Sequence, residues 1–345
     1  MSRRALLDLT HEQLAEWLQS HGQPAYRVKQ IWRGVFRDLA ADYKAITTLP
    51  LPLRELLSER LPLDPLVAAA STEDKAQRVR KLLFRLGDGE TIEAVLMRYE
   101  RRRTACLSSQ VGCPVGCAFC ATGQDGYVRD LSTGEIVAQA LSFARSLKAN
   151  GERLTNIVYM GMGEPLLNYD ATLQSIRILN DPRGFGLGVR AFTVSTAGVV
   201  PRIRRLAREG LEIGLAVSLH TVDDALRNTL VPLNRTHAVA ELLAACREYV
   251  DVTHRRITFE VALLRGVNDS QQQAQDLAIR LDGLLCHVNL IPGNPCTGTE
   301  LQPSSRTVID RFAEILQGAG VPTTVRVARG LEIEAGCGQL RRRHL

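Results

Sequence analysis

The sequence contains no apolar run that approaches the ~18 residues needed to cross a membrane. Its opening residues 1–8 (MSRRALLD) also lack the apolar core of a signal peptide. Hydrophobic residues make up 45% and charged residues 23%, which is ordinary globular usage and argues against a disordered, collagen-like or coiled-coil chain. We therefore expect a soluble cytoplasmic protein whose 345 residues form a main domain and a smaller one.

Lysine is scarce, because 38 of the 43 cationic side chains are arginine. Arginine binds phosphate bidentately and stacks on bases, but a net charge of +6 over this length is only a mild indication of nucleic acid binding. The eight cysteines are more informative, since four of them lie between Cys106 and Cys120. Without a secretory signal, such clustering favours metal or redox chemistry over structural disulfides.

Residues 1–75 are expected to form a helical accessory domain. Thr10-His11-Glu12-Gln13 is a capping box, and Val28, Ile31, Trp32, Val35 and Phe36 follow at helical spacing. A third short helix is expected after residues 49–52. The cations between these apolar positions form either a solvated helix face or a face that touches RNA.

Residues 76–104 are expected to form a β-hairpin extension. Two apolar runs, 81–86 and 91–96, flank the turn signal Gly87-Asp88-Gly89. Glu93 lies inside the returning strand, and the pattern alone places its side chain on the outward face.

From residue 105 to residue 345, short β-rich runs alternate with helical stretches. The strands are expected near 104–109, 156–160, 192–195, 213–219, 257–263 and 286–291, with another apolar run at 323–327. Strands separated by helices predict an α/β fold with a partial (β/α)6 barrel. Unusual groups of residues follow several of these strands, and the carboxyl ends of barrel strands are where active sites assemble.

Three cysteines, Cys113, Cys117 and Cys120, form a C-x3-C-x2-C run after the first of these strands. Three thiolates on one loop can hold three irons of a [4Fe–4S] cluster and leave the fourth iron open. Structural zinc normally takes four ligands, often from two separated cysteine pairs. Cys106 could supply a fourth ligand, so a zinc site remains the alternative.

Several ordered segments resemble one known family. They are the run from Cys106 to Cys120, residues 161–168 (GMGEPLLN), residues 195–201 (STAGVVP), Ser218-Leu219-His220 and residues 335–340 (AGCGQL). The chain is similar over nearly its whole length to the radical S-adenosylmethionine RNA methyltransferases of the RlmN family, whose partial β/α barrel agrees with the predicted strands.

The resemblance implies a cofactor site. Cys113, Cys117 and Cys120 would bind the [4Fe–4S] cluster, whose open iron would chelate S-adenosylmethionine and give a 5′-deoxyadenosyl radical. Gly163 and Glu164 would receive the methionine amino group. The remaining cofactor contacts would come from Ser195, Ser218, Leu219, His220 and Asn294.

The resemblance also implies a reaction that uses two molecules of S-adenosylmethionine. One would methylate Cys337, and the radical from the other would activate that methyl group for addition to carbon 2 of an adenosine. Cys106 would then form a disulfide with Cys337 as the protein–RNA adduct resolves. Glu93 matches the position of a proton acceptor.

The implied partners are 23S rRNA, tRNA beside the anticodon, and an electron donor such as flavodoxin, with the protein acting as a monomer in the reducing cytoplasm. Related enzymes methylate carbon 8 of the same adenosine and share Cys106 and Cys337, so that target is an alternative. With RNA as the implied substrate, residues 1–75 are expected to be an RNA-binding accessory domain. The arginines on its helices, residues 101–103 and the basic residues 341–343 are candidate phosphate contacts. Cys246 and Cys286 are expected to be buried small hydrophobes, and Cys296 has no assigned role.

Overall fold

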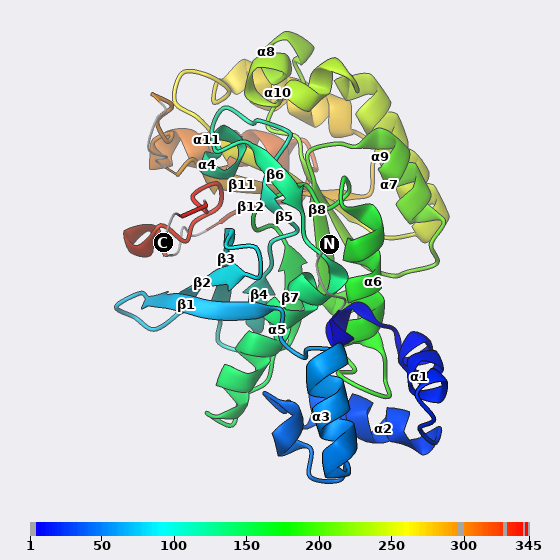
Figure 1. The fold of residues 1–345 in the computed structure, drawn as a ribbon. Helices are drawn as coiled ribbons and strands as arrows, with labels where there is room; N and C mark the ends of the chain where they lie inside the picture. Colours follow the sequence, from blue (N-terminus) through cyan, green and yellow to red (C-terminus); the bar gives the residue numbers. More distant parts are fainter. Residues whose placement is uncertain (1–4, 295–299, 327–329, 341, 344–345) are drawn as a thin grey trace.

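The structure is a computed structural model that describes residues 5–294, 300–326, 330–340 and 342–343. Three helices come first, α1 (His11–Ser20), α2 (Tyr26–Trp32) and α3 (Leu51–Arg60), and a large sheet with helices on its outer face follows (Figure 1). In these ranges, none of the helices has the length and apolar character needed to cross a membrane.

The strands of the large sheet lie in the order β1, β2, β3, β4, β7, β8, β9, β10, β11, β12. Their bounds are β1 Leu66–Glu73, β2 Val79–Leu86, β3 Thr91–Arg98, β4 Arg103–Cys106, β7 Asn156–Tyr159, β8 Phe192–Thr196, β9 Gly214–Ser218, β10 Ile257–Leu263, β11 Cys286–Pro292 and β12 Thr323–Val325. The pairs up to β3 and β4 are antiparallel, and every later pair is parallel. The parallel strands form the partial barrel that the sequence predicts.

Helices connect the parallel strands and cover the outer face of the barrel (Figure 1). They are α5 (Thr133–Lys148), α6 (Tyr169–Asn180), α7 (Val200–Ala207), α8 (Asp224–Leu230), α9 (Val239–Thr253), α10 (Gln271–Leu281) and α11 (Arg306–Gly318). Between β4 and α5, the short helix α4 (Ala121–Gln124) and a small sheet of β5 (Gln110–Gly112) and β6 (Tyr127–Asp130) hold the cysteine loop.

The two faces of the barrel strands differ in polarity. In β10, Phe259 and Val261 are almost fully buried among apolar residues, whereas Glu260 lies on the inner face, in register with Ser218 and Asn289. The Asn289 amide donates to Glu260 Oε1 over 3.0 Å. The interior of the barrel is therefore polar near the carboxyl ends of its strands.

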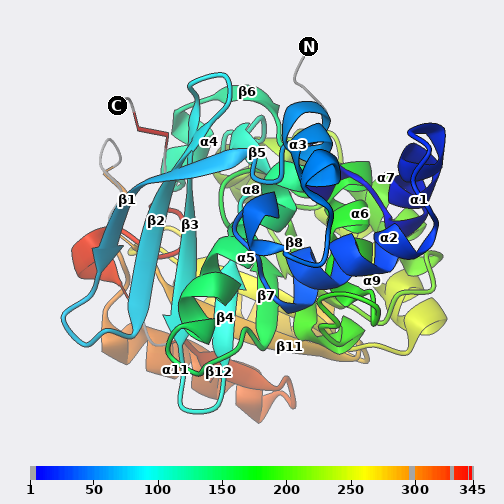
Figure 2. The same cartoon turned by 60° about the horizontal axis from the view of Figure 1, so that its bottom comes forward.

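The predicted hairpin is confirmed, with β2 and β3 joined across residues 87–90. Figure 2 shows these long strands side by side with β1. This strand lies within residues 1–75, which were expected to be helical, so that expectation is wrong for residues 66–73. Seven of the eight β1 residues are exposed. An exposed edge strand lacks the alternation that would have identified it.

The N-terminal helices pack against the barrel helices. Thr10 caps α1 through the predicted capping box, in which its hydroxyl accepts from the Gln13 N–H over 3.2 Å. Asp8 accepts from the Gly134 N–H at the start of α5 over 2.6 Å. A Cβ at Gly184 would lie 2.6 Å from Trp32 Nε1, so the loop after α6 fits closely on α2.

Residues 330–340 and 342–343 lie beside the hairpin, where they are seen in red in Figure 1. The Lys75 N–H donates to Glu332 Oε1 over 2.8 Å, and the Arg343 N–H donates to Thr91 Oγ1 over 2.9 Å. We call these described residues the C-terminal segment. It contacts the antiparallel end of the sheet at both of these points.

Candidate active site

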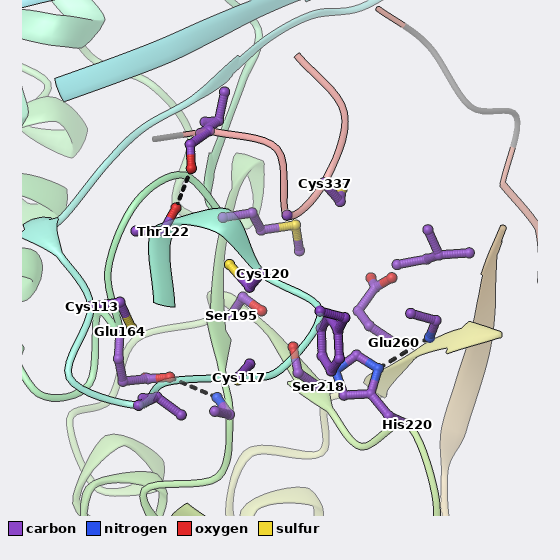
Figure 3. A pocket seen from close by; sticks show the side chains of 18 of the residues that line it. Cys113, Cys117, Cys120, Thr122, Glu164, Ser195, Ser218, His220, Glu260 and Cys337 are labelled. Carbon is purple, nitrogen blue, oxygen red and sulfur yellow. Dashed lines mark hydrogen bonds between the residues drawn. The ribbon is translucent and has the colours of Figure 1, made fainter. Parts of the chain in front are cut away.

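A cavity lies at the carboxyl ends of the parallel strands (Figure 3). Most of the predicted site residues line it, and they come from loops that are far apart in the sequence. They are Cys113, Cys117, Cys120, Gly163, Glu164, Ser195, Ser218, His220, Asn294 and Cys337. The convergence predicted from the strand ends is therefore present, whereas Leu219, Cys106 and Glu93 lie outside the set that lines the cavity.

The three cysteines of the C-x3-C-x2-C loop all line this cavity. The loop begins at Gly112, which has a φ of +75° and where a Cβ would lie 1.9 Å from the Gly126 carbonyl oxygen, so glycine is required there. Its far side is tied to α8, because the Ala118 N–H donates to the Leu230 carbonyl over 3.0 Å. Burial raises the pKa of the Cys113 thiol to about 12, and it raises that of Cys117 with help from the neighbouring thiols.

The donor set of this loop fits an iron–sulfur cluster. Within the described residues, no three His, Cys, Asp or Glu side chains are grouped as ligands of a single metal ion. Each iron of a cluster takes a separate thiolate, and the three loop cysteines line one cavity. Cys106, the fourth ligand of the zinc alternative, does not line that cavity.

Glu164 is held firmly at the wall of the cavity. Its carboxylate accepts from the Leu166 N–H over 3.0 Å and from the Ala197 N–H over 2.7 Å, so it links the loops that follow β7 and β8. Burial raises its pKa to about 7. Gly163 has a φ of +98°, and a Cβ there would lie 2.5 Å from Gln110 Cβ.

His220 closes β9 with a φ of +62° and lines the cavity as a neutral ring. Its Nδ1 accepts from the Ala262 N–H over 3.1 Å, and its ring contacts Phe119 edge-on with centroids 4.6 Å apart. Burial and the nearby Arg227 lower its pKa to about 3. Leu219, by contrast, places its side chain in the hydrophobic core.

Cys337 is exposed, as expected, and faces the cavity from the C-terminal segment (Figure 3). Its carbonyl accepts from the Asn294 amide over 2.8 Å, and the Gly338 carbonyl accepts from the Ala121 N–H over the same distance. Cys106 is 8% exposed at the end of β4, and burial together with the nearby Cys337 raises its pKa to about 12.

The structure contains no disulfide among the described cysteines, and Cys106 and Cys337 are both free thiols. The expected disulfide is therefore not a structural bond. Cys246 and Cys286 are buried as predicted, at 0% and 4% exposure. Cys296 and Arg341 lie outside the described residues.

The outward position that the strand pattern predicts for Glu93 is wrong. Glu93 is 1% exposed, and its carboxylate lies 3.0 Å from Lys81 Nζ and 3.2 Å from Arg343 Nε. In the register of the sheet, Glu93 and Cys106 lie on the same face, because Val95 is directly opposite Cys106. That face is the interior of the fold, and the two cations compensate the buried charge.

Sequence reasoning missed three charged residues at the site. Glu260 and Arg326 line the cavity. Burial lowers the pKa of Arg326, but the charges of Cys337 and Glu260 have the larger combined effect and hold this pKa above its usual range. Arg227 is 1% exposed and donates to the carbonyls of Ala197, Ser218 and Leu219. Glu260 could have been found, since a charged residue inside an apolar strand is unusual.

The fold and the site define a radical S-adenosylmethionine protein, a class in which a loop of three cysteines at the top of a partial barrel binds a [4Fe–4S] cluster and S-adenosylmethionine. Residues 107–278 match the family described as the Radical SAM superfamily. Residues 4–62 match the family described as the ribosomal RNA large subunit methyltransferase N-terminal domain.

Full-length comparisons identify the family. A protein of Chloroflexus aurantiacus named "Probable dual-specificity RNA methyltransferase RlmN" is 48% identical, with 100% of this chain and 94% of that protein covered. A protein of the same name from Mycolicibacterium paratuberculosis is 46% identical, with 98% and 94% covered. The crystal structure of a radical SAM methyltransferase from Sphaerobacter thermophilus is 52% identical, covers 98% of this chain and 99% of its own, and has a TM-score of 0.97. The chain belongs to the RlmN family of radical SAM methyltransferases.

Proposed function

We propose that the protein methylates carbon 2 of an adenosine in 23S rRNA and of the adenosine beside the anticodon of tRNA. The observation that carries this proposal is the free thiol of Cys337, which lines the cavity together with the three loop cysteines. Cys106 is also a free thiol and lies at the end of β4, where burial and the charge of Cys337 raise its pKa. Carbon 2 of adenine is electrophilic and does not attack a methyl sulfonium. The methyl group therefore has to be carried and activated by a residue of the protein.

The three loop cysteines would bind the cluster, and Gly163, Glu164, Ser195, Ser218 and Asn294 would hold S-adenosylmethionine beside it. When bound, the two cofactors supply a carbon radical and an electrophilic methyl group. Because His220 is uncharged at neutral pH, it can orient the cofactor without competing with the open iron for the methionine carboxylate. Because its side chain is in the core, Leu219 would contribute only its backbone.

Cys337 would accept the methyl group as a thiolate, because the thiolate is the nucleophilic form of cysteine. Burial raises the pKa of the Cys337 thiol, and the cationic Arg326 in the same cavity opposes that rise.

Radical addition leaves an unpaired electron and the carbon-2 hydrogen on the ring, so the adduct would return one electron to the cluster and lose that proton to the expected acceptor, Glu93. Cys106, as a thiolate, would then attack the Cys337 sulfur, so that a disulfide forms as the bond between Cys337 and the methylene carbon breaks. That carbon would leave with the electron pair and take up a proton, which gives the methylated RNA. A thiol reductant would reduce the disulfide before the next turnover.

Among residues 101–103, the arginines expected to contact RNA are those whose side chains are not already paired with a carboxylate. Arg103 is engaged with Glu152 over 2.5 Å, whereas the Arg102 guanidinium lies over the Tyr99 ring, 5.1 Å from its centroid. We infer that Arg101 and Arg102 are better candidates for phosphate contacts than Arg103. We also infer a monomer that works in the cytoplasm with an electron donor such as flavodoxin.

The decisive experiment is mass spectrometry of 23S rRNA and tRNA from cells that lack the gene and from cells complemented with it. Methylation at carbon 2 supports the proposal, and methylation at carbon 8 identifies the alternative target. Methylation at neither position refutes both. Iron and sulfide content tests the cluster separately, since a colourless protein with stoichiometric zinc would contradict it.

The resolving step has its own test. Cys106→Ala should leave protein covalently attached to RNA through Cys337, which is detected as an RNA-linked band that nuclease removes. Cys246→Ala is the matched control, because Cys246 is a buried thiol on α9 that does not line the cavity. Normal turnover in Cys106→Ala would show that Cys106 does not resolve the adduct.

A further inference from the structure

A second cavity lies at the end of the barrel opposite to the active site. It has a volume of about 610 Å³, and its lining residues fall within residues 36–39, 144–155 and 182–191. The last two stretches end where β7 and β8 begin, so this cavity is at the amino ends of the parallel strands. The first stretch belongs to the N-terminal region. We call this cavity the amino-end groove.

The amino-end groove carries positive charge. Arg37, Lys148 and Arg153 line it, and all three side chains are exposed. In the part of the chain that the structure describes, neither Arg37 nor Arg153 forms an ion pair with a carboxylate. Lys148 Nζ donates to the Asp38 carbonyl over 2.8 Å, which leaves its charge uncompensated. Three cations around one hollow attract anions.

The carboxylate of Glu152 also lines the groove, but it is already compensated. Arg103 lies 2.5 Å and Arg98 lies 3.5 Å from its oxygens. Arg98 ends β3 and Arg103 begins β4, so the residues between them are at the same end of the barrel as the groove. The proposed phosphate contacts at residues 101 and 102 therefore lie on the side of the amino-end groove and not beside the catalytic cavity.

A buried hydrogen-bond donor lies against the wall of the groove. Trp32 is 1% exposed, and its Nε1 has no hydrogen-bond partner among the described residues. Gly184 lines the groove, and a Cβ there would lie 2.6 Å from Trp32 Nε1, so no side chain separates this donor from the wall. Buried donors in native proteins nearly always have an acceptor. A ligand with acceptor oxygens would supply the one that is missing.

We propose that the amino-end groove binds backbone phosphates of the RNA substrate, with Arg37 and Arg153 as the main contacts and Lys148 as a third cation. Arginine suits this role because its guanidinium binds phosphate oxygens bidentately. The proposal rests on the function proposed above, since RNA is the polyanion on which the protein acts.

The position of the groove decides which RNA can reach it. The five residues of β8 span about 17 Å from the amino end to the carboxyl end of the barrel. Only an RNA that extends well beyond the target nucleotide can therefore occupy the catalytic cavity and the groove together. A short single-stranded oligonucleotide that contains the target adenosine reaches the cavity alone.

The test measures RNA affinity of the cluster-loaded protein by fluorescence anisotropy at several salt concentrations. The double variant Arg37→Gln with Arg153→Gln should weaken binding of an unmodified tRNA transcript about tenfold at low salt. The slope of log K against log salt should become shallower by about 1.5, the effect of losing two phosphate contacts. Binding of the short oligonucleotide should not change. Replacing both arginines by lysine should preserve the slope.

Arg190→Gln with Arg311→Gln is the matched control, because it removes the same charge from two exposed arginines. These side chains pair with Glu212 over 2.8 Å and with Glu314 over 3.0 Å, and neither lines the groove. The control should bind the transcript within about twofold of the unmodified protein, since no phosphate contact is lost. Equal urea midpoints for both double variants and the unmodified protein show that folding is intact.

The indole of Trp32 gives a second measurement. The chain has two tryptophans, so ¹⁵N labelling gives two indole N–H signals in an NMR spectrum, and Trp17→Phe assigns them. The Trp32 signal should shift when the transcript is added and should stay in place with the short oligonucleotide. Inorganic phosphate is the comparison probe, because it offers the same oxygens without an RNA chain.

Two results would overturn the proposal. One is a salt slope for the arginine-to-glutamine variant of the groove equal to that of the matched control. The other is a Trp32 signal that shifts with inorganic phosphate but not with the transcript, which would make the groove a site for a free anion. If no RNA is methylated at carbon 2, the proposed function fails, but the salt slopes still decide whether the groove binds RNA.

Discussion

Gly163 offers a direct test of how the backbone is built around the cofactor site. An alanine there would have to adopt a φ of +98°, and its Cβ would lie 2.5 Å from Gln110 Cβ and 2.7 Å from Gln110 N. A left-handed conformation costs about 1–2 kcal/mol, and overpacking against backbone adds about 1–3 kcal/mol. Gly163→Ala is therefore expected to lower the free energy of unfolding by roughly 2–5 kcal/mol.

Gly151→Ala is the matched control. Gly151 also has a positive φ, +71°, but nothing lies within 4 Å of the position that its Cβ would occupy. Only the conformational cost applies, so the loss should be about 1–2 kcal/mol. The two variants are compared by urea unfolding and by S-adenosylmethionine binding, which only Gly163→Ala should weaken. Equal losses of stability would refute the reasoning from close contact with Gln110.

Three further predictions follow from single contacts. Burial lowers the pKa of His220 in the folded protein below its ordinary 6.5, so the unfolded chain takes up the proton first and stability falls as the pH drops below 6.5. Between pH 7.5 and 5.5 the free energy of unfolding should fall by about 1.4 kcal/mol. Urea unfolding of His220→Asn should lack this component. Arg227 donates to the side-chain oxygen of Asn234 as well as to the three carbonyls named above, and Arg227→Lys keeps the charge but cannot serve four separate acceptors. This variant should lose about 3–5 kcal/mol in urea unfolding and bind less iron, and unchanged stability would contradict this role. Thr122→Val removes a buried 2.5 Å hydrogen bond to the Leu340 carbonyl. It should lower the free energy of unfolding by about 1–3 kcal/mol and speed proteolysis of the C-terminal segment. Thr229→Val, at an exposed helix position, is the control and should do neither.

Local signals in the sequence predicted local structure well. The capping box at Thr10 and the turn at residues 87–89 each involve contacts only a few residues apart, and both are present. The convergence of the residues that follow the strands was predictable for a different reason, because strand ends in a parallel barrel meet at one edge wherever their helices lie. The cofactor contacts assigned to these residues came instead from the resemblance to the RlmN family.

The roles of buried charges were not predictable in this way. Glu93 was placed outward because its partner Arg343 is 250 positions away, and no periodicity records such a pairing. Arg227 lies on α8 with no carboxylate in direct contact among the described residues, and its hydrogen bonds to backbone carbonyls leave no trace in side-chain patterns. The edge strand β1 escaped detection because it is exposed on both faces.

The contacts between the cysteine loop and the C-terminal segment have a consequence for biosynthesis. Ala121 and Thr122 bond to Gly338 and Leu340, and the Arg342 N–H donates to Asp125 over 3.1 Å. These partners are more than 200 positions apart, so the ribosome makes the loop long before it makes the segment. During that interval the nascent barrel lacks one wall of its cavity. The three cysteines therefore stay uncovered on that side until residues 338–342 have been made.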